Sequence, residues 1–168
     1  MSQVVNNDGS INRYEVPNMN DETWIPSRPK THTNSLLERN KSFGEEFKKM
    51  IKMMKWWNHQ HSSLLQSYHI EVLSLNILVG TFSNFPWESF NWFDKAHGLC
   101  GSSLWHDGAY ADAYLDWNTR QEVLKRLATA RDKSRDAWYL THGQNDDHKR
   151  AIELWRQVFG DKFPAYGS

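Results

Sequence analysis

The sequence predicts a mainly helical fold, a bundle of helices with a small β-hairpin at its N-terminal end. Apolar residues recur at three- and four-residue spacing from about Gly44 onward, which is the period of an amphipathic helix. The earlier residues carry a hairpin signal and three prolines instead. Aromatic residues make up 14 % of the 168 residues, a share that favours a packed core. We therefore expect a hairpin and an irregular loop over residues 1–43 and a helical domain over residues 44–168.

The hairpin is predicted from Asp8-Gly9, which lies between the short segments Gln3–Val5 and Ile11–Val16. An Asp-Gly pair between two such segments is a hairpin signal. The prolines that follow break regular structure, so we expect an irregular loop in which Trp24 packs on the core. These prolines are Pro17, Pro26 and Pro29.

The first long helix is predicted from residues that share one helical face, and the second from a nearly continuous apolar run. The second helix covers Leu64–Val79, and a segment that is apolar on all sides is typical of a buried helix. At about 16 residues it is short for a membrane span. The face of the first helix is formed by Phe47, Met50, Met54, Trp57 and His61.

Three further helices are expected in the C-terminal half. One covers roughly Trp87–His97 and is followed by a glycine-marked loop that extends past Gly108. The next begins at Thr119, because Thr119 and Glu122 have the spacing of a capping box. The last covers His148–Phe159, and Gly160 stands where a helix commonly ends.

Composition limits the classes of function. Lysine and arginine total 20 and aspartate and glutamate total 20, so any phosphate site must come from local clustering and no specific nucleic-acid binding is predicted. The only cysteine is Cys100, which has no nucleophile motif near it, so we expect a buried or idle thiol. The sequence shows neither a membrane span nor a signal peptide, so we expect a cytoplasmic protein.

A line of basic residues follows the first long helix. Lys48, Lys52, Lys55 and His59 lie at i, i+4, i+7 and i+11, next to the apolar face. Several positive charges in a row suit a polyphosphate. A solvated lysine face is the alternative, and on periodicity alone it is the favoured interpretation.

A second candidate anion site lies at the start of the buried helix, at Ser67-Tyr68-His69. The free backbone donors of a helix N-terminus favour anions, and a serine hydroxyl there can donate to a phosphate. The alternatives are that Ser67 only caps the helix and that Tyr68 fills the core. His59 and His61 do not predict a metal site, because residues two apart on a helix point about 200° apart.

Several segments resemble one family of enzymes in their order and spacing. Ile51–Asn58 is similar to the helix of cyclic-oligonucleotide synthases that carries a lysine before Trp-Asn, and Gln66–Leu73 is similar to the segment that follows it. Tyr114–Asp116 and Ala151–Pro164 resemble the family's pre-helix segment and its C-terminal ending. The chain is thus identified as similar to the C-terminal part of nucleotidyltransferases of the oligoadenylate synthase and bacterial cyclic-oligonucleotide synthase type. The early loop resembles theirs at Tyr14–Pro17, Trp24, Pro29, Lys30 and His32.

The resemblance implies a reaction and a set of binding residues. Two magnesium ions held by acidic residues align a nucleoside triphosphate for attack by a ribose hydroxyl. Lys55 and Ser67 would contact the triphosphate, and Tyr68 would stack near the base. His59 stands where related enzymes often carry a second lysine, and Lys52 lies on the same basic line. Glu71 is expected to be a structural partner and not a metal ligand.

The sequence departs from the family in the residues that hold the metal. The family carries Gly-Ser followed by two carboxylates two residues apart, and no two acidic residues of this chain have that spacing. Asp8-Gly9-Ser10 has the reverse order. No ligand set for magnesium is therefore expected within the chain, and none of its residues is predicted to be catalytic. We expect a C-terminal piece, the product of a split gene, or a decayed copy.

Two hypotheses of function follow. In the first, residues 1–43 join a missing catalytic sheet, and the chain is the nucleotide-binding portion of an enzyme that makes cyclic or linear oligonucleotide second messengers in antiviral defence. The isolated chain would be inactive, and its partners would be nucleoside triphosphates and a separate N-terminal catalytic half. In the second, the chain is a non-catalytic helical module that binds nucleotide or a partner protein.

Overall fold

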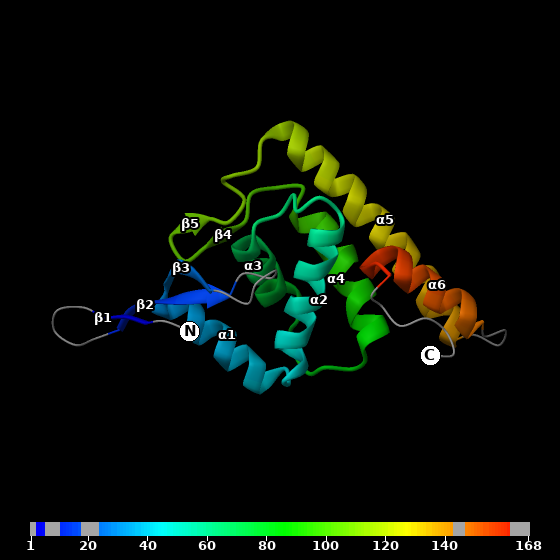
Figure 1. The fold of residues 1–168 in the computed structure, drawn as a ribbon, viewed down its shortest axis with the longest axis horizontal. Coiled ribbons are helices and arrows are strands. Elements are labelled where there is room, and N and C mark those ends of the chain that lie inside the picture. Colours follow the sequence, from blue (N-terminus) through cyan, green and yellow to red (C-terminus); the bar gives the residue numbers. More distant parts are fainter. Residues whose placement is uncertain (1–2, 6–10, 18–23, 143–146, 162–168) are drawn as a thin grey trace.

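The protein is mainly helical, as the sequence predicts, and a small antiparallel sheet lies at its N-terminal end (Figure 1). A computed structural model describes residues 3–5, 11–17, 24–142 and 147–161, with side chains in 32–141 and 147–161. No described helix is long and apolar enough to cross a membrane. The helices are α1 (Lys30–Ser42), α2 (Glu46–Gln60), α3 (Ser67–Ile77), α4 (Phe85–Leu99), α5 (Trp117–His142) and α6 (His148–Phe159).

The N-terminal sheet has one strand more than the sequence predicts. Strand β2 (Ile11–Pro17) pairs antiparallel with β1 (Gln3–Val5), which confirms the predicted pairing, while the Asp8-Gly9 turn lies outside the described residues. Strand β3 (Trp24–Pro29) pairs with the other side of β2, so the irregular loop expected there is wrong. Two prolines fit in β3 because it is an edge strand, where a missing N–H removes no hydrogen bond from the inside of the sheet.

Helix α1 is the second correction to the expected irregular N-terminal segment. It contacts β2 and β3 on one side and α2 and α3 on the other. Its buried face is partly polar: His32 is buried, and the Arg39 guanidinium donates to the carbonyls of Leu75 and Leu78 at 2.7 and 2.9 Å. Because this buried face of α1 is polar and pairs with residues far away in the sequence, it has no apolar periodicity. The sequence pattern therefore does not predict the helix.

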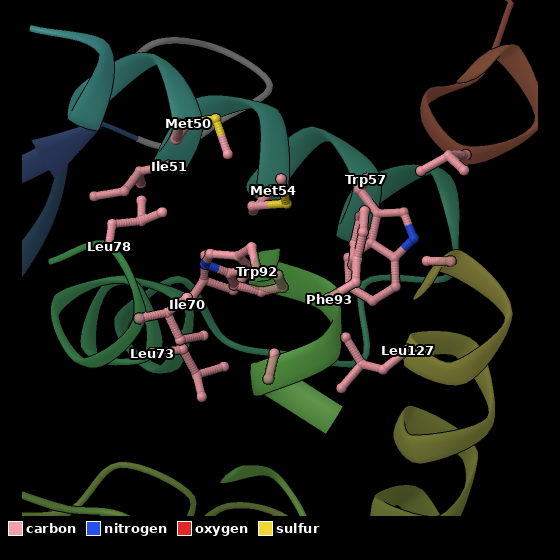
Figure 2. Packing of buried hydrophobic residues seen from close by; sticks show 14 of the residues in the cluster. Met50, Ile51, Met54, Trp57, Ile70, Leu73, Leu78, Trp92, Phe93 and Leu127 are labelled. Atoms are coloured by element: carbon pink, nitrogen blue, oxygen red, sulfur yellow. The ribbon is translucent and has the colours of Figure 1, made fainter. Parts of the chain in front are cut away.

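The core lies between α2, α3 and α4 and extends to α5 (Figure 2). The expected face of α2 is confirmed at Phe47, Met50, Met54 and Trp57, all of which are buried. Helix α3 is buried nearly all round and begins at Ser67, three residues after the expected start. On α4, the fully buried Trp92 donates its indole N–H to the Ser74 hydroxyl at 3.0 Å, so the large ring leaves no unpaired donor.

The two C-terminal helices pack against each other along one side of the molecule (Figure 1). Helix α5 begins at Trp117, so the predicted cap at Thr119 is wrong. The Asp116 carboxylate accepts from the Thr119 backbone N–H at 2.7 Å instead, and this hydrogen bond holds the pKa of Asp116 below its ordinary value. The end of α6 is confirmed: Gly160 follows Phe159 with φ +89°, and its N–H donates to the Arg156 carbonyl.

The expected glycine-marked loop between α4 and α5 contains a short hairpin. Strands β4 (Trp105–His106) and β5 (Ala109–Tyr110) pair antiparallel across Asp107 and Gly108, which both have positive φ, as a type I′ turn requires. The residues that flank the hairpin hold it in place. The Asp112 carboxylate accepts from the Leu104 N–H at 2.7 Å and forms an ion pair with Arg120 at 2.5 Å. Asp107-Gly108 between two pairs that each contain an aromatic residue is the sequence signal of this hairpin.

Candidate phosphate-binding site

The candidate site is built around Lys55, which lies in the interior and not on a solvated face. Its Nζ donates to Oε2 of Glu71 at 2.9 Å, and 9 % of the Lys55 surface is exposed. Lys55 is on α2 and Glu71 is on α3, so the ion pair joins the two helices that enclose the core. A lysine ammonium has three donors, and one is used by Glu71. Among the described residues, no other hydrogen bond of the Lys55 ammonium is found, which leaves two donors for an anion.

Two histidines complete the cluster. Nε2 of His32, on α1, lies 2.9 Å from Oε1 of Glu71, so each carboxylate oxygen has its own partner. Nδ1 of His32 lies 3.3 Å from Nε2 of His106, on the β4–β5 hairpin. The ring of Tyr68 stands edge-on to His32 with centroids 4.8 Å apart. The carboxylate of Glu71 on α3 is thus contacted from α1 and α2, and the β4–β5 hairpin joins the cluster through His32.

The electrostatics of the cluster keep the carboxylate ionised. Burial raises the pKa of Glu71, but the hydrogen bond from His32 and the charge and hydrogen bond of Lys55 outweigh burial, and the pKa ends below its ordinary value. Burial lowers the pKa of His106, and the neighbouring His32 lowers it further. The negative Glu71 carboxylate accepts from the Lys55 ammonium and holds it at the N-terminal half of α3.

Ser67 lies one helical turn before Glu71 on the same face of α3. Side chains at i and i+4 on a helix are neighbours, and both lean toward the helix N-terminus. Because Lys55 bonds to Glu71, the two residues predicted to hold a triphosphate lie on adjacent helices within about one turn of each other. Ser67 is half-buried and is the first residue of α3, and the N-cap position itself is Gln66.

The basic line predicted on α2 is divided between solvent and interior. Lys48, Lys52 and His59 are exposed, while Lys55 is buried. The imidazole of His59 lies beside the ring of Trp56, with centroids 5.5 Å apart. The structure therefore places Lys55 and Tyr68 in the cluster around Glu71, with Ser67 one helical turn before Glu71, and leaves Lys52 and His59 on the outer surface of α2.

Sequence reasoning identified Glu71 as a structural partner but did not place His106 in the site, and His32 entered only through the family resemblance. The available signal for His106 was the Asp107-Gly108 turn, because a two-residue hairpin there fixes the direction of the side chain before it. No local pattern links these two histidines to Glu71, because the three segments meet only in the folded protein.

A second polar cluster lies at the same, N-terminal end of α3, at Gln66 and His69. The Tyr114 hydroxyl accepts from the Gln66 N–H and lies 2.7 Å from Nδ1 of His69, whose Nε2 is buried without a partner among the described residues. Burial lowers the pKa of His69 to about 4. Burial also raises the pKa of Cys100 to about 12, which matches the expected buried thiol.

Metal ligands are not grouped in the described part of the chain. Among the side chains of residues 32–141 and 147–161, no three of His, Cys, Asp or Glu are placed to hold a metal ion. His59 lies beside Trp56, while Nε2 of His61 donates to the Val158 carbonyl at 2.9 Å.

Comparison with known proteins gives relatives of one kind. No protein-family model matches the chain. The chain is 28 % identical over 166 residues to a probable cyclic nucleotide synthase of Bacillus cereus, covering 91 % of this chain and 46 % of that protein. It is 24 % identical over 166 residues to a cyclic AMP-AMP-AMP synthase of an Acinetobacter species, covering 92 % of this chain and 48 % of that protein. The chain thus spans about half the length of these curated relatives.

Among solved structures, the chain is similar in fold to Escherichia coli MS115-1 CdnC, whose structure contains ATP. The TM-score is 0.66 at 14 % identity, and the match covers 97 % of this chain and 58 % of CdnC. At that identity the likeness establishes the fold: the mainly helical arrangement with its small sheet is the one found in part of CdnC.

Proposed function

We propose that this chain is the C-terminal, nucleotide-binding portion of a nucleotidyltransferase that makes cyclic or linear oligonucleotide second messengers. The observation that carries the proposal is the placement of Lys55 beside Glu71, one turn from Ser67. The similarity to two cyclic nucleotide synthases over more than nine-tenths of the chain supports the same conclusion. The substrates would be nucleoside triphosphates.

Each binding residue has a physical role in this proposal. Lys55 would donate to non-bridging phosphate oxygens while Glu71 keeps its ammonium in place, and the Ser67 hydroxyl would donate to the same triphosphate. The N-terminal N–H groups of α3 add a favourable dipole for the anion. Tyr68 would lie beside the base. Lys52 and His59 would act only as outer charges on the approach to the site, because both are exposed.

Metal chemistry would come from residues outside this chain. The residues present do not fit a magnesium pair, since no two carboxylates stand two positions apart in the sequence and magnesium needs hard oxygen ligands. We therefore propose that these 168 residues are inactive alone and work with a catalytic half that holds the metal. A role in bacterial antiviral signalling is proposed on the family resemblance.

The proposal is tested by titrating ATP into the purified chain at low and at physiological salt. Wild-type binding should weaken as salt rises, and Lys55→Met and Ser67→Ala should each reduce affinity at least tenfold. Lys49→Ala is the matched control, because Lys49 is an exposed lysine of the same helix. Binding that survives both substitutions would exclude this site as the phosphate site.

The alternative is a helical module that binds nucleotide without taking part in catalysis. The absence of two carboxylates two positions apart in the sequence favours this alternative, since a binding module needs no metal. Sequencing the genomic region upstream of Met1 separates the two. A reading frame that encodes Gly-Ser and Asp-x-Asp supports the enzyme, and the absence of such a frame in the genome supports the module.

A further inference from the structure

A second basic site lies on the opposite side of α2 from Lys55. A hollow of about 180 Å³ opens between the C-terminal end of α2, the middle of α5 and the end of α6. His61, Lys125, Arg126 and Lys133 line it, together with Glu122 and the amide of Gln157. Four basic side chains thus surround one carboxylate in a protein whose formal net charge is zero. This local excess is what attracts an anion to a neutral protein.

The hollow is separate from the Lys55 cluster. Trp57 and His61 are four residues apart on α2, share one face and line the hollow. Lys55 is two residues before Trp57, so its side chain leaves the helix about 200° away and reaches Glu71 on α3. An anion in the hollow would therefore not contact the proposed triphosphate site.

The groups that would repel an anion in the hollow are already bonded. The C-terminal carbonyls of a helix carry partial negative charge, and two helices end here. Arg126 donates to the His61 carbonyl and to the Glu122 carboxylate, and His61 donates to the Val158 carbonyl. The carbonyls of His61 and Val158 are therefore already hydrogen-bonded, and Arg126 pairs with Glu122, the only carboxylate among the residues that line the hollow.

The two lysines of the hollow remain without an ion-pair partner among the described residues. Lys133 is half-buried and lines the hollow, whereas Lys125 lines it from an exposed position. Lys125 lies eight residues earlier on the same helix, about 12 Å along the axis. Two long side chains that start that far apart can converge on a ligand with two linked charged groups better than on a single phosphate.

We propose that this hollow binds a diphosphate group, with Lys125 and Lys133 each contacting one phosphate and Gln157 supplying a neutral donor. Free pyrophosphate and the diphosphate of a nucleotide share this chemistry. The size of the hollow suits the diphosphate itself, and the base of a nucleotide would extend into solvent along α5.

The test is calorimetric titration of the full chain with pyrophosphate and, separately, with ADP, at low salt. Lys125→Ala/Lys133→Ala should lose affinity for pyrophosphate at least tenfold with an unchanged melting temperature. Lys41→Ala/Lys49→Ala removes the same charge from exposed positions elsewhere and should bind as wild type does. In Lys55→Met the pyrophosphate isotherm should keep the component that Lys125→Ala/Lys133→Ala removes, even where phosphate binding at the Lys55 cluster is lost, so this result and the function proposed above are tested separately.

Four outcomes would overturn the proposal. They are no pyrophosphate binding by the wild-type chain, equal binding by all variants, equal losses in the two double variants, or a loss confined to Lys55→Met. When the loss is confined to the Lys125 and Lys133 variant, the tighter of the two ligands identifies the source of the diphosphate. Tighter pyrophosphate indicates the free anion, and tighter ADP indicates a nucleotide.

Discussion

The Lys55 ammonium lies 2.9 Å from the Glu71 carboxylate, with almost all of both side chains removed from water. The pair joins α2 to α3 across 16 residues of sequence, and His32 brings α1 to the same carboxylate. Taking two charges out of water is costly, and their attraction offsets that cost only while both are present. The two residues therefore have to be considered as one unit.

Removing Glu71 alone should destabilise the fold strongly. Glu71→Gln leaves Lys55 charged and buried without a counter-charge, so we expect a loss of about 3–5 kcal/mol in the free energy of unfolding. Lys55→Met/Glu71→Gln should recover a large part of that loss, because neither charge remains. Urea unfolding of the two single variants and the double variant measures the coupling, and additive losses would contradict a coupled pair.

The stability of the protein should rise with pH between about 4 and 6.5 because of His69. Burial lowers the pKa of His69 to about 4, whereas the unfolded chain binds the proton near the ordinary value. Between these two pKa values the unfolded chain binds a proton that the folded chain does not, so the free energy of unfolding falls as the pH falls. The contribution of His69 is fully present above pH 6.5 and lost below about pH 4, a difference on the order of 3 kcal/mol.

The His69 contribution is measured by urea unfolding at several pH values for the wild type and His69→Gln. The variant keeps an acceptor for Tyr114 but cannot titrate, so its stability should depend less on pH. His106 also has a lowered pKa and remains, so some slope persists in the variant. Identical slopes for the two proteins would exclude His69 as a source.

Two glycines in helix-terminal positions should respond in opposite ways to alanine. Gly160 has φ +89°, and an added Cβ would lie 2.7 Å from the Gln60 side-chain oxygen, so Gly160→Ala should cost about 1–3 kcal/mol. Gly98 lies within α4 and has open space around its Cα, so Gly98→Ala should stabilise by up to about 1 kcal/mol. Thermal melts of both variants check the signs.

The core should be sensitive at Phe93, which contacts aromatic rings on three sides. Its ring is fully buried and lies 5.1 Å from the Trp57 ring and 5.7 Å from the Trp92 ring. Phe93→Ala should cost about 3–5 kcal/mol. Trp117→Ala is the control, because Trp117 is 72 % exposed and its removal should change stability by less than about 0.5 kcal/mol. Equal melting temperatures for the two variants would contradict the packing described.

The sequence predicts those helices whose buried face is apolar. Helix α2 has Phe47 and Met54 on one apolar face, and α6 has Trp155 on its own apolar face. All three side chains are buried in the core, as the pattern predicts. Helix α1 was missed because its buried face contains His32 and Arg39, which other segments of the chain stabilise. Amphipathic periodicity reports burial of apolar groups only.

The candidate site was predictable only in part for the same reason. Residue types and positions predict Lys55, Ser67 and Tyr68 as binding residues, and the fold places Lys55 and Tyr68 in the cluster around Glu71, while their binding of a triphosphate stays a prediction. The alternative of a solvated lysine face fits Lys52 and is wrong for Lys55, which is buried against Glu71. Nothing along the chain distinguishes these two lysines, because the difference is a carboxylate on another helix.

The two-residue turn between β4 and β5 determines which side chain reaches the interior. Neighbouring residues of a strand project in opposite directions, so His106 lies against His32 while Trp105 is 59 % exposed. Inserting one residue before the turn would exchange the two and present an indole to the buried carboxylate cluster. This surface hairpin should therefore not tolerate a change of length, even though it is far in sequence from His32 and Glu71.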